Sequence, residues 1–171
     1  MIHVYYGDGK GKTTAAVGLA VRAAGQNLAV LFAQFLKSDS SGEVESLRSI
    51  DRIELLHATK QFGFVRDMTD EQKQETKKEI NHMYDCIVFW LNQHPYGVVV
   101  LDEILHAHNY GFLSTEQCHT LLEQYASTAE LVITGRNPDP MWLQKADYIT
   151  EFKKHKHPYD QGIAARKGIE F

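Results

Sequence analysis

The chain has few cysteines, which excludes a disulfide-rich protein, and few prolines, which is inconsistent with a proline-rich linker. Its 171 residues include 2 cysteines and 4 prolines. Cys86 and Cys118 lie too far apart in the sequence to form a metal-type or redox-type pair. We expect both thiols to lie in or near the core of a protein kept in a reducing cytosol.

Long apolar runs and an excess of positive charge are also missing. The longest apolar run, Cys86 to Leu91, is much shorter than the roughly 20 residues of a membrane-spanning helix. We expect no signal peptide before the first strand. The formal net charge of -4 argues against nucleic acid as the main partner. We therefore expect a soluble cytoplasmic protein that binds neither a membrane nor nucleic acid.

The chain does contain a regular alternation of apolar runs with helical stretches. The unbroken apolar run from Val98 to Leu101 is typical of a strand that is covered on both faces. This alternation predicts an α/β fold with a mainly parallel sheet and helices on both sides. With an apolar share of 43% and no linker, a single domain over residues 1–171 is expected. We expect six strands, at 2–6, 28–35, 52–56, 97–101, 129–134 and 147–152.

Capping boxes mark the start of two helices. Thr69 with Gln72, and Ser114 with Gln117, have the spacing at which side chains and backbone amides bond reciprocally. The first box opens a long helix whose apolar residues recur at three-to-four spacing: Ile80, Met83, Ile87 and Leu91.

The most informative motif connects the first expected strand to a helix over residues 13–24. It reads Gly7-Asp8-Gly9-Lys10-Gly11-Lys12-Thr13-Thr14. Glycines allow positive φ and turn backbone N–H groups inward, and these donors and the positive end of the helix dipole both suit a polyphosphate. With the Lys12 ammonium, and with the Thr13 hydroxyl as a magnesium ligand, the motif predicts a P-loop that binds a nucleoside triphosphate. The loop is compact, because three residues separate Gly7 from Gly11 and Tyr6 stands where the usual first glycine would be.

Two further strand ends carry side chains suited to a phosphate site. Asp102 and Glu103 follow the apolar run at 98–101, in the Walker B position where an acidic group holds magnesium directly or through water. Arg136 follows the strand at 129–134 and can counter the charge that develops on a phosphate. A surface ion pair is the alternative for Arg136. Parallel strands end at the same edge of a sheet, so we expect these residues to meet the P-loop.

The compact loop resembles that of the P-loop-type ATP:corrinoid adenosyltransferases of cobalamin biosynthesis and corrinoid salvage. Further segments are similar to the same family in the same order, and the similarity covers essentially the whole chain. The resemblance implies a P-loop NTPase-like fold of three layers, αβα. The similar segments are Ala33–Lys37, Ser41–Glu43, Val99–Glu103, Ile133–Arg136 and His157–Phe171.

The resemblance also implies an activity. Members of the family transfer the 5′-deoxyadenosyl group of ATP to the Co(I) centre of a corrinoid, which forms the Co–C bond of adenosylcobalamin or its precursors and releases triphosphate. The corrinoid supplies the nucleophile, so no serine, cysteine or general base is needed. MgATP and the corrinoid are the expected substrates, reduced flavodoxin or a reduced flavin the expected electron donor, and a homodimer the expected assembly.

The resemblance assigns roles to individual residues as well. All eight residues of the P-loop motif are expected to bind the nucleotide, and Lys12 and Arg136 to stabilise the departing triphosphate. Phe62 and Phe64 match an aromatic pair that crowds out the lower axial ligand of cobalt, although Phe64 stands where tryptophan is frequent. The alternative is that both phenylalanines are core residues. Other cofactor contacts are expected from Gln34, Lys37, Glu103, Arg136 and His157, and magnesium ligands from Thr13, Asp102 and Glu103.

Two other functions fit a P-loop. A small-molecule or nucleotide kinase would present a lid with several arginines. The six arginines of this chain are scattered instead, at positions 22, 48, 52, 66, 136 and 166. An ATP-sensing or ATP-binding module would not need the acidic pair at 102 and 103.

Overall fold

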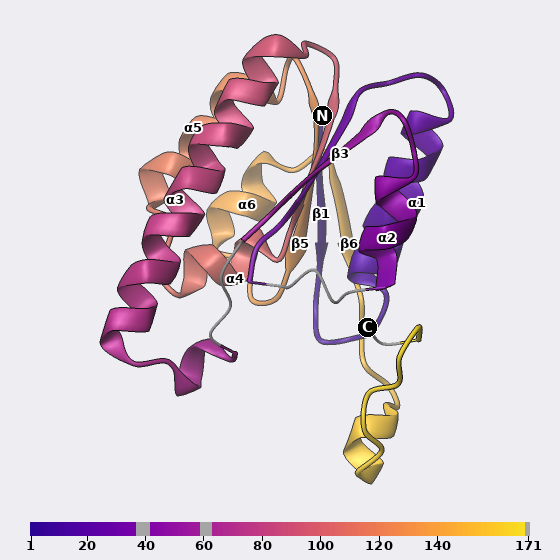
Figure 1. Cartoon of the computed structure of the whole chain (residues 1–171), viewed down its shortest axis with the longest axis vertical. Coiled ribbons are helices and arrows are strands. Elements are labelled where there is room, and N and C mark those ends of the chain that lie inside the picture. Colours follow the sequence, from indigo (N-terminus) through magenta and orange to yellow (C-terminus); the bar gives the residue numbers. More distant parts are fainter. Residues whose placement is uncertain (37–41, 59–62, 170–171) are drawn as a thin grey trace.

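A single parallel sheet forms the centre of the molecule. The computed structural model describes residues 1–36, 42–58 and 63–169 (Figure 1). The strand order is β3-β2-β4-β5-β1-β6, and every neighbouring pair is parallel. The α/β prediction and its six strands are therefore confirmed, with ends that shift slightly. The strands are β1 (Ile2–Tyr6), β2 (Val30–Gln34), β3 (Ile53–His57), β4 (Val98–Asp102), β5 (Glu130–Gly135) and β6 (Tyr148–Glu151).

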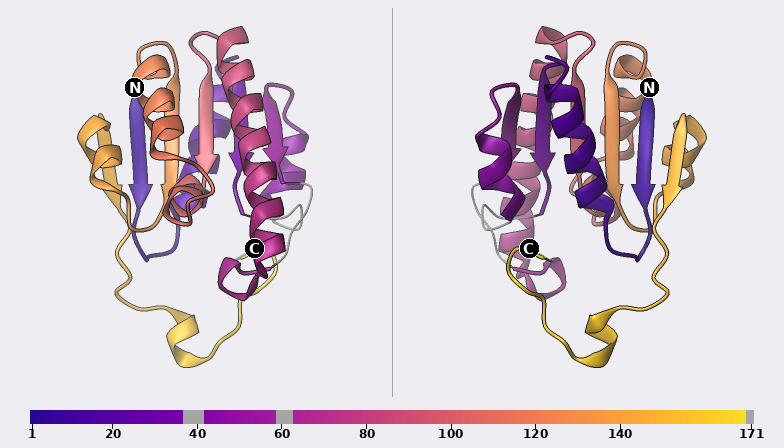
Figure 2. Two further views of the ribbon diagram at one scale, coloured as in Figure 1. Left: turned by 90° about the vertical axis from the view of Figure 1, so that its left-hand side faces the viewer. Right: turned by 90° about the vertical axis from the view of Figure 1, so that its right-hand side faces the viewer.

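Helices cover both faces of this sheet, which gives the three expected layers (Figures 1 and 2). On one face lie α1 (Lys12–Ala24) and α2 (Gly42–Arg48). The other face carries α3 (Asp70–Gln93), α4 (Ile104–Asn109), α5 (Thr115–Tyr125) and α6 (Pro140–Lys145). Two short 3₁₀ helices, η1 (Val65–Asp67) and η2 (Pro158–Gln161), lie in the connections.

The central strand β4 is buried on both faces, as its unbroken apolar run predicts. Val98 and Val100 belong to the core cluster that packs under α1. Val99 and Leu101 belong to the larger cluster, under α3 and α5. Successive side chains of a strand point to opposite faces, so an apolar residue is needed at every position.

Both predicted capping boxes are formed. The Gln72 backbone N–H donates to the Thr69 hydroxyl over 3.3 Å, and the Thr69 N–H donates to the Gln72 side chain over 2.9 Å. Ser114 and Gln117 exchange the same pair of bonds, at 2.9 and 3.1 Å. The buried face of α3 includes all four predicted apolar residues, Ile80, Met83, Ile87 and Leu91.

The two cysteines differ in burial. Cys118 is fully buried, and burial raises the pKa of its thiol to about 12, with a smaller contribution from the negative charge of Asp139. Cys86 is half-buried on α3 and is also a free thiol. Over residues 1–36, 42–58 and 63–169, the helices are all too short or too polar to span a bilayer.

The carboxyl ends of the strands lie at one edge of the sheet, and the last part of the chain runs along this edge. Figure 2 shows the chain leaving β6, passing through η2 beyond the edge of the sheet and then turning back toward it. Residues that are far apart in the sequence therefore gather here, at the edge where open α/β sheets bind ligands.

Candidate functional site

The predicted P-loop, here called the phosphate loop, connects β1 to α1 and is shaped by its glycines. Gly7 and Gly11 both have a φ of 116°, in the left-handed region that favours glycine. A Cβ at Gly9 would lie 2.7 Å from the carbonyl oxygen of Phe152, and a Cβ at Gly7 would overlap the same atom. The Gly9 N–H donates to that carbonyl over 2.7 Å, so it faces Phe152 and not a phosphate. Both the turn and the close approach of the chain after β6 thus require glycine.

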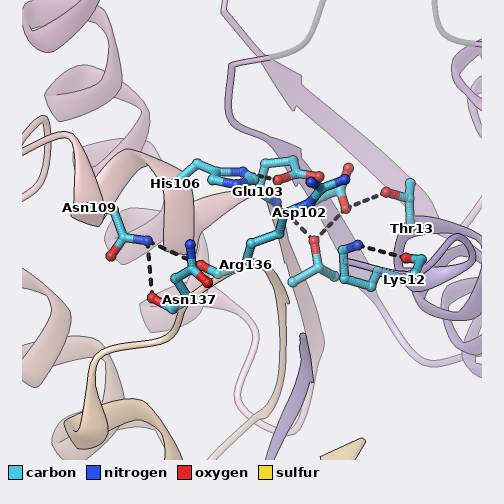
Figure 3. A network of polar contacts seen from close by, with 10 residues as sticks. Lys12, Thr13, Asp102, Glu103, His106, Asn109, Arg136 and Asn137 are labelled. Atoms are coloured by element: carbon cyan, nitrogen blue, oxygen red, sulfur yellow. Dashed lines mark hydrogen bonds and ion pairs between the residues drawn. The ribbon is translucent and has the colours of Figure 1, made fainter. Parts of the chain in front are cut away.

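Lys12 is the first residue of α1, and its side chain points back toward the loop. Its side chain is buried, and Nζ donates a hydrogen bond of 3.0 Å to the carbonyl oxygen of Gly9 (Figure 3). The ammonium is therefore held at the helix N-terminus, where backbone dipoles also favour an anion. This is the expected place for a phosphate-binding lysine.

Asp102, at the end of β4, is hydrogen-bonded to the first turn of α1 and to the end of β5. Its side chain is fully buried, and Oδ1 accepts from the hydroxyl of Thr13 over 2.9 Å and from that of Thr134 over 2.7 Å (Figure 3). The Thr134 hydroxyl in turn accepts the backbone N–H of Glu103 over 2.9 Å. Two hydroxyl donors stabilise a buried carboxylate. The two predicted motifs, the P-loop at Thr13 and the Walker B position at Asp102, are therefore in contact.

Glu103 has a different environment from its neighbour. Its backbone lies in the left-handed region, with φ of 65°, at the start of α4. One turn later, the His106 ring nitrogen Nδ1 bonds to the Glu103 carboxylate (Figure 3). The two adjacent carboxylates are thus used differently: Asp102 binds hydroxyls inside the fold, and Glu103 pairs with a histidine at the cavity wall.

Arg136 is exposed on the loop after β5. A side chain of α4 holds this loop in place through hydrogen bonds. The Asn109 side-chain amide donates to the carbonyl oxygens of Arg136 and Asn137, each over 3.1 Å (Figure 3). The positive charge of Arg136 also affects Asp8 in the P-loop motif. The pKa of Asp8 is lowered first by a hydrogen bond from the Lys154 backbone, then by its own backbone N–H, and further by the positive charges of Lys154 and Arg136.

A cavity of about 820 Å³ opens at this edge of the sheet. Phe64 is 72% exposed, which is inconsistent with the alternative that it is a core residue. The guanidinium of Arg66 lies 5.2 Å from the centroid of its ring, and both side chains line the cavity. The lining brings together six predicted site residues: Asp8, Lys12, Phe64, Glu103, Arg136 and His157.

Other predicted site residues lie outside this lining. The Gln34 side chain is buried and donates to the Glu43 carboxylate over 3.0 Å. Lys10 and Thr14 are exposed on the loop and on α1. Lys37 and Phe62 lie outside the described residues, so the aromatic pair is described only at Phe64.

Several residues of the site were not identified from the sequence. Thr134 lies in a segment that resembles the family, but only the fold shows its hydroxyl between Asp102 and Glu103. Asn109 carries no motif at all. The chain after β6 contributes more of the cavity wall than His157 alone, namely Lys154, Pro158–Asp160 and Ile163–Arg166. The family resemblance at the end of the chain was the available signal for this last group.

Comparison with known proteins shows the family of this chain. A sequence model of the family described as ATP:corrinoid adenosyltransferase BtuR/CobO/CobP matches residues 1–171. A corrinoid adenosyltransferase of Pseudomonas aeruginosa is 32% identical over 169 residues, which cover 98% of this chain and 82% of the relative. A corrinoid adenosyltransferase of Escherichia coli K12 is 31% identical over 172 residues, covering 100% of this chain and 85% of the relative. One from Salmonella typhimurium is 29% identical, with 100% and 85% of the two chains covered.

Proposed function

The chain belongs to the ATP:corrinoid adenosyltransferase family, whose function is ATP-dependent adenosyl transfer to a corrinoid, and we propose that it performs this reaction in the cavity at the carboxyl edge of the sheet. One observation carries the assignment to this cavity. The phosphate-loop lysine Lys12 and the exposed aromatic residue Phe64 line the same space. A polyphosphate site and an apolar surface that cannot ligate cobalt are the two environments that this reaction requires.

The triphosphate of ATP is assigned to the phosphate loop. Lys12 and Arg136 supply fixed positive charge, and a helix N-terminus lies beside them. The oxygen atoms of Thr13 and Asp102 lie 2.9 Å apart, and hydroxyl and carboxylate oxygens suit Mg²⁺. Thr13 and Asp102 would therefore hold the ion, with Glu103 acting through water. Bound magnesium would neutralise charge on the phosphate oxygens.

The protein's contribution to the chemistry is positioning and charge stabilisation. Co(I) of the corrinoid attacks C5′ of the ribose, the C5′–O bond breaks, and the bonding electrons leave with the triphosphate. Lys12 and Arg136 stabilise this leaving group. No protein nucleophile is required, and the one cysteine in the core, Cys118, has a pKa of about 12 and is fully buried.

Phe64 is assigned to the face of the corrinoid from which the lower axial ligand must be removed. Its ring is exposed in the cavity and offers no atom that can bind cobalt. We assign Phe62 to the same task from the family resemblance. Loss of the axial ligand leaves four-coordinate Co(II), which is more easily reduced to Co(I).

The remaining partners are proposed from the resemblance and from the chemistry. Formation of Co(I) needs a one-electron donor, for which we propose reduced flavodoxin or a reduced flavin. A homodimer is the proposed assembly. The proposed location is the cytoplasm, where a strongly reducing Co(I) intermediate and the free thiols of Cys86 and Cys118 are compatible with the surroundings.

Product analysis tests the proposed function. The protein is incubated with MgATP and a chemically reduced corrinoid, the optical spectrum reports the Co–C bond, and phosphorus NMR identifies the product. Adenosyl transfer yields equal amounts of adenosylated corrinoid and triphosphate. ADP as the product would indicate a kinase. If neither triphosphate nor ADP formed, the chain would be an ATP-binding module and the proposal would be wrong.

A further inference from the structure

The segment that follows β6, residues 152–169 and here called the C-terminal segment, is attached to the phosphate loop at its first residue. The Phe152 N–H donates to the carbonyl oxygen of Tyr6 over 2.7 Å, and its own carbonyl accepts the Gly9 N–H over 2.7 Å. Phe152 lies so close to the loop that a side chain would not fit at positions 7 and 9, where the chain has Gly7 and Gly9. The start of the segment is therefore packed directly on the loop that is assigned to the triphosphate.

Lys154 extends this attachment to the far part of the segment. Its backbone N–H donates to the Asp8 carboxylate over 3.4 Å, and its Nζ donates to the Asp160 carboxylate over 2.9 Å. Asp8 belongs to the phosphate loop, whereas Asp160 belongs to η2. All three residues line the cavity. Lys154 thus contacts both the loop that is assigned to ATP and the turn that forms part of the cavity wall.

The charges around Lys154 explain why a cation is needed there. Asp8 is a carboxylate beside a loop that must bind an anion, and the hydrogen bond from the Lys154 backbone lowers its pKa, so it stays ionised. Asp160 adds a second carboxylate to the same cavity. The Lys154 ammonium pairs with Asp160, and its positive charge also lowers the pKa of Asp8, so it offsets negative charge at both carboxylates.

The wall that Lys154 holds in place contains large side chains that face the ligand space. Tyr159, next to Asp160 in η2, is 76% exposed and lines the cavity, as does Ile163, which is 49% exposed. Phe64 lines the same cavity from the connection between β3 and α3. The distance between these surfaces decides how well a flat macrocycle fits between them.

We propose that Lys154 is a positioning residue for adenosyl transfer: its Nζ contact with Asp160 holds η2 toward the start of the C-terminal segment, which is itself bonded to the phosphate loop, and thereby sets the corrinoid-binding width of the cavity. This inference rests on the proposed function. It assigns Lys154 an effect on corrinoid affinity, with little effect on nucleotide affinity or on the chemical step.

The test compares Lys154→Gln with a matched control, Lys153→Gln, in the full chain. Lys153 is the adjacent lysine, forms a surface ion pair of 3.3 Å with Glu151, and is not part of the cavity lining. The kcat and the two KM values are measured with MgATP and chemically reduced corrinoid. Loss of a partly exposed ion pair predicts that Lys154→Gln raises the corrinoid KM about 2- to 5-fold, with kcat and the ATP KM changed less than about 2-fold. Lys153→Gln leaves all three values unchanged.

A double-mutant cycle and a rescue test the mechanism. Asp160→Asn is expected to raise the corrinoid KM by a similar factor, and the double variant with Lys154→Gln no further, because both changes remove the same contact. Lys154→Arg keeps the charge and is expected to restore the wild-type corrinoid KM.

Three results would overturn the inference. The first is an equal corrinoid KM in Lys154→Gln and Lys153→Gln. The second is that Lys154→Gln and Asp160→Asn raise the corrinoid KM additively. The third is an increase in the ATP KM alone, which would make Lys154 a phosphate ligand. Failure of the proposed function is distinguishable from these results, because the wild-type protein would then form no Co–C bond at all.

Discussion

Thr134 gives the sharpest test of the network beneath the phosphate site. Its hydroxyl is fully buried, donates to the Asp102 carboxylate over 2.7 Å and accepts the Glu103 N–H over 2.9 Å. Thr134→Val keeps the shape of the side chain and replaces the hydroxyl by a methyl group. The substitution therefore removes two hydrogen bonds without creating a cavity.

The expected cost follows from the two bonds. Loss of a hydrogen bond to a carboxylate costs about 1.5–3 kcal/mol, and loss of the bond to the Glu103 amide about 1 kcal/mol. The added buried methyl group returns about 0.8 kcal/mol. We expect the free energy of unfolding to fall by about 2–3 kcal/mol, which for a chain of this size lowers the Tm by about 4–12 °C.

Urea denaturation followed by far-UV circular dichroism measures this loss, and two variants serve as controls. Thr134→Ser keeps the hydroxyl and loses one buried methyl group, so it is expected to cost about 1 kcal/mol. Thr150→Val makes the same chemical change on the exposed strand β6 and is expected to stay within about 0.5 kcal/mol of wild type.

The order of the three variants decides the outcome. The hydrogen-bond argument requires Thr134→Val to be the least stable, although it fills the site better than serine does. A Thr134→Val protein as stable as wild type, or more stable than Thr134→Ser, would show that packing and not the bond to Asp102 determines the residue at this position.

Three further predictions concern the site and the thiols. Lys12→Ala is expected to lower the rate of adenosyl transfer at least about 100-fold, because the leaving triphosphate loses a fixed charge, and unchanged turnover would contradict the P-loop assignment. Phe62→Ala with Phe64→Ala is expected to spare ATP binding but to reduce four-coordinate Co(II) in the EPR spectrum, so an unaltered spectrum would exclude the axial-ligand role. Iodoacetamide at pH 8 is expected to label Cys86 and not Cys118 in the folded protein. Because the Cys118 pKa is about 12, its thiol stays protonated and unreactive at pH 8. Mass spectrometry that finds both thiols labelled would contradict the burial of Cys118.

Most of the fold could be predicted from local patterns in the sequence. The apolar run of β4 and the two capping boxes involve residues close together in the chain, and their physical meaning does not depend on distant partners. Strand ends were less certain, and β2 begins at Val30 instead of residue 28. The hydrogen bonds that end a strand depend on its neighbours in the sheet, which a local pattern does not contain.

The two halves of the proposed phosphate site were also visible in the sequence, but the contact between them was not. Thr13 and Asp102 are separated by 89 positions, and Asp102 and Thr134 by 32. Each residue lies in a recognisable motif. The parallel order of β4, β5 and β1 is what brings their ends together, and Thr134 gains a role only through that order.

The sequence by itself determined the α/β class, the P-loop motif and the resemblance to the adenosyltransferases, because each depends on residue types at short, fixed spacing. Only the tertiary structure decided that Phe64 is exposed in the cavity and that Lys154 links Asp8 to Asp160. Exposure and ion pairing depend on which distant segments fold against one another, and here the chain after β6 returns to the phosphate loop.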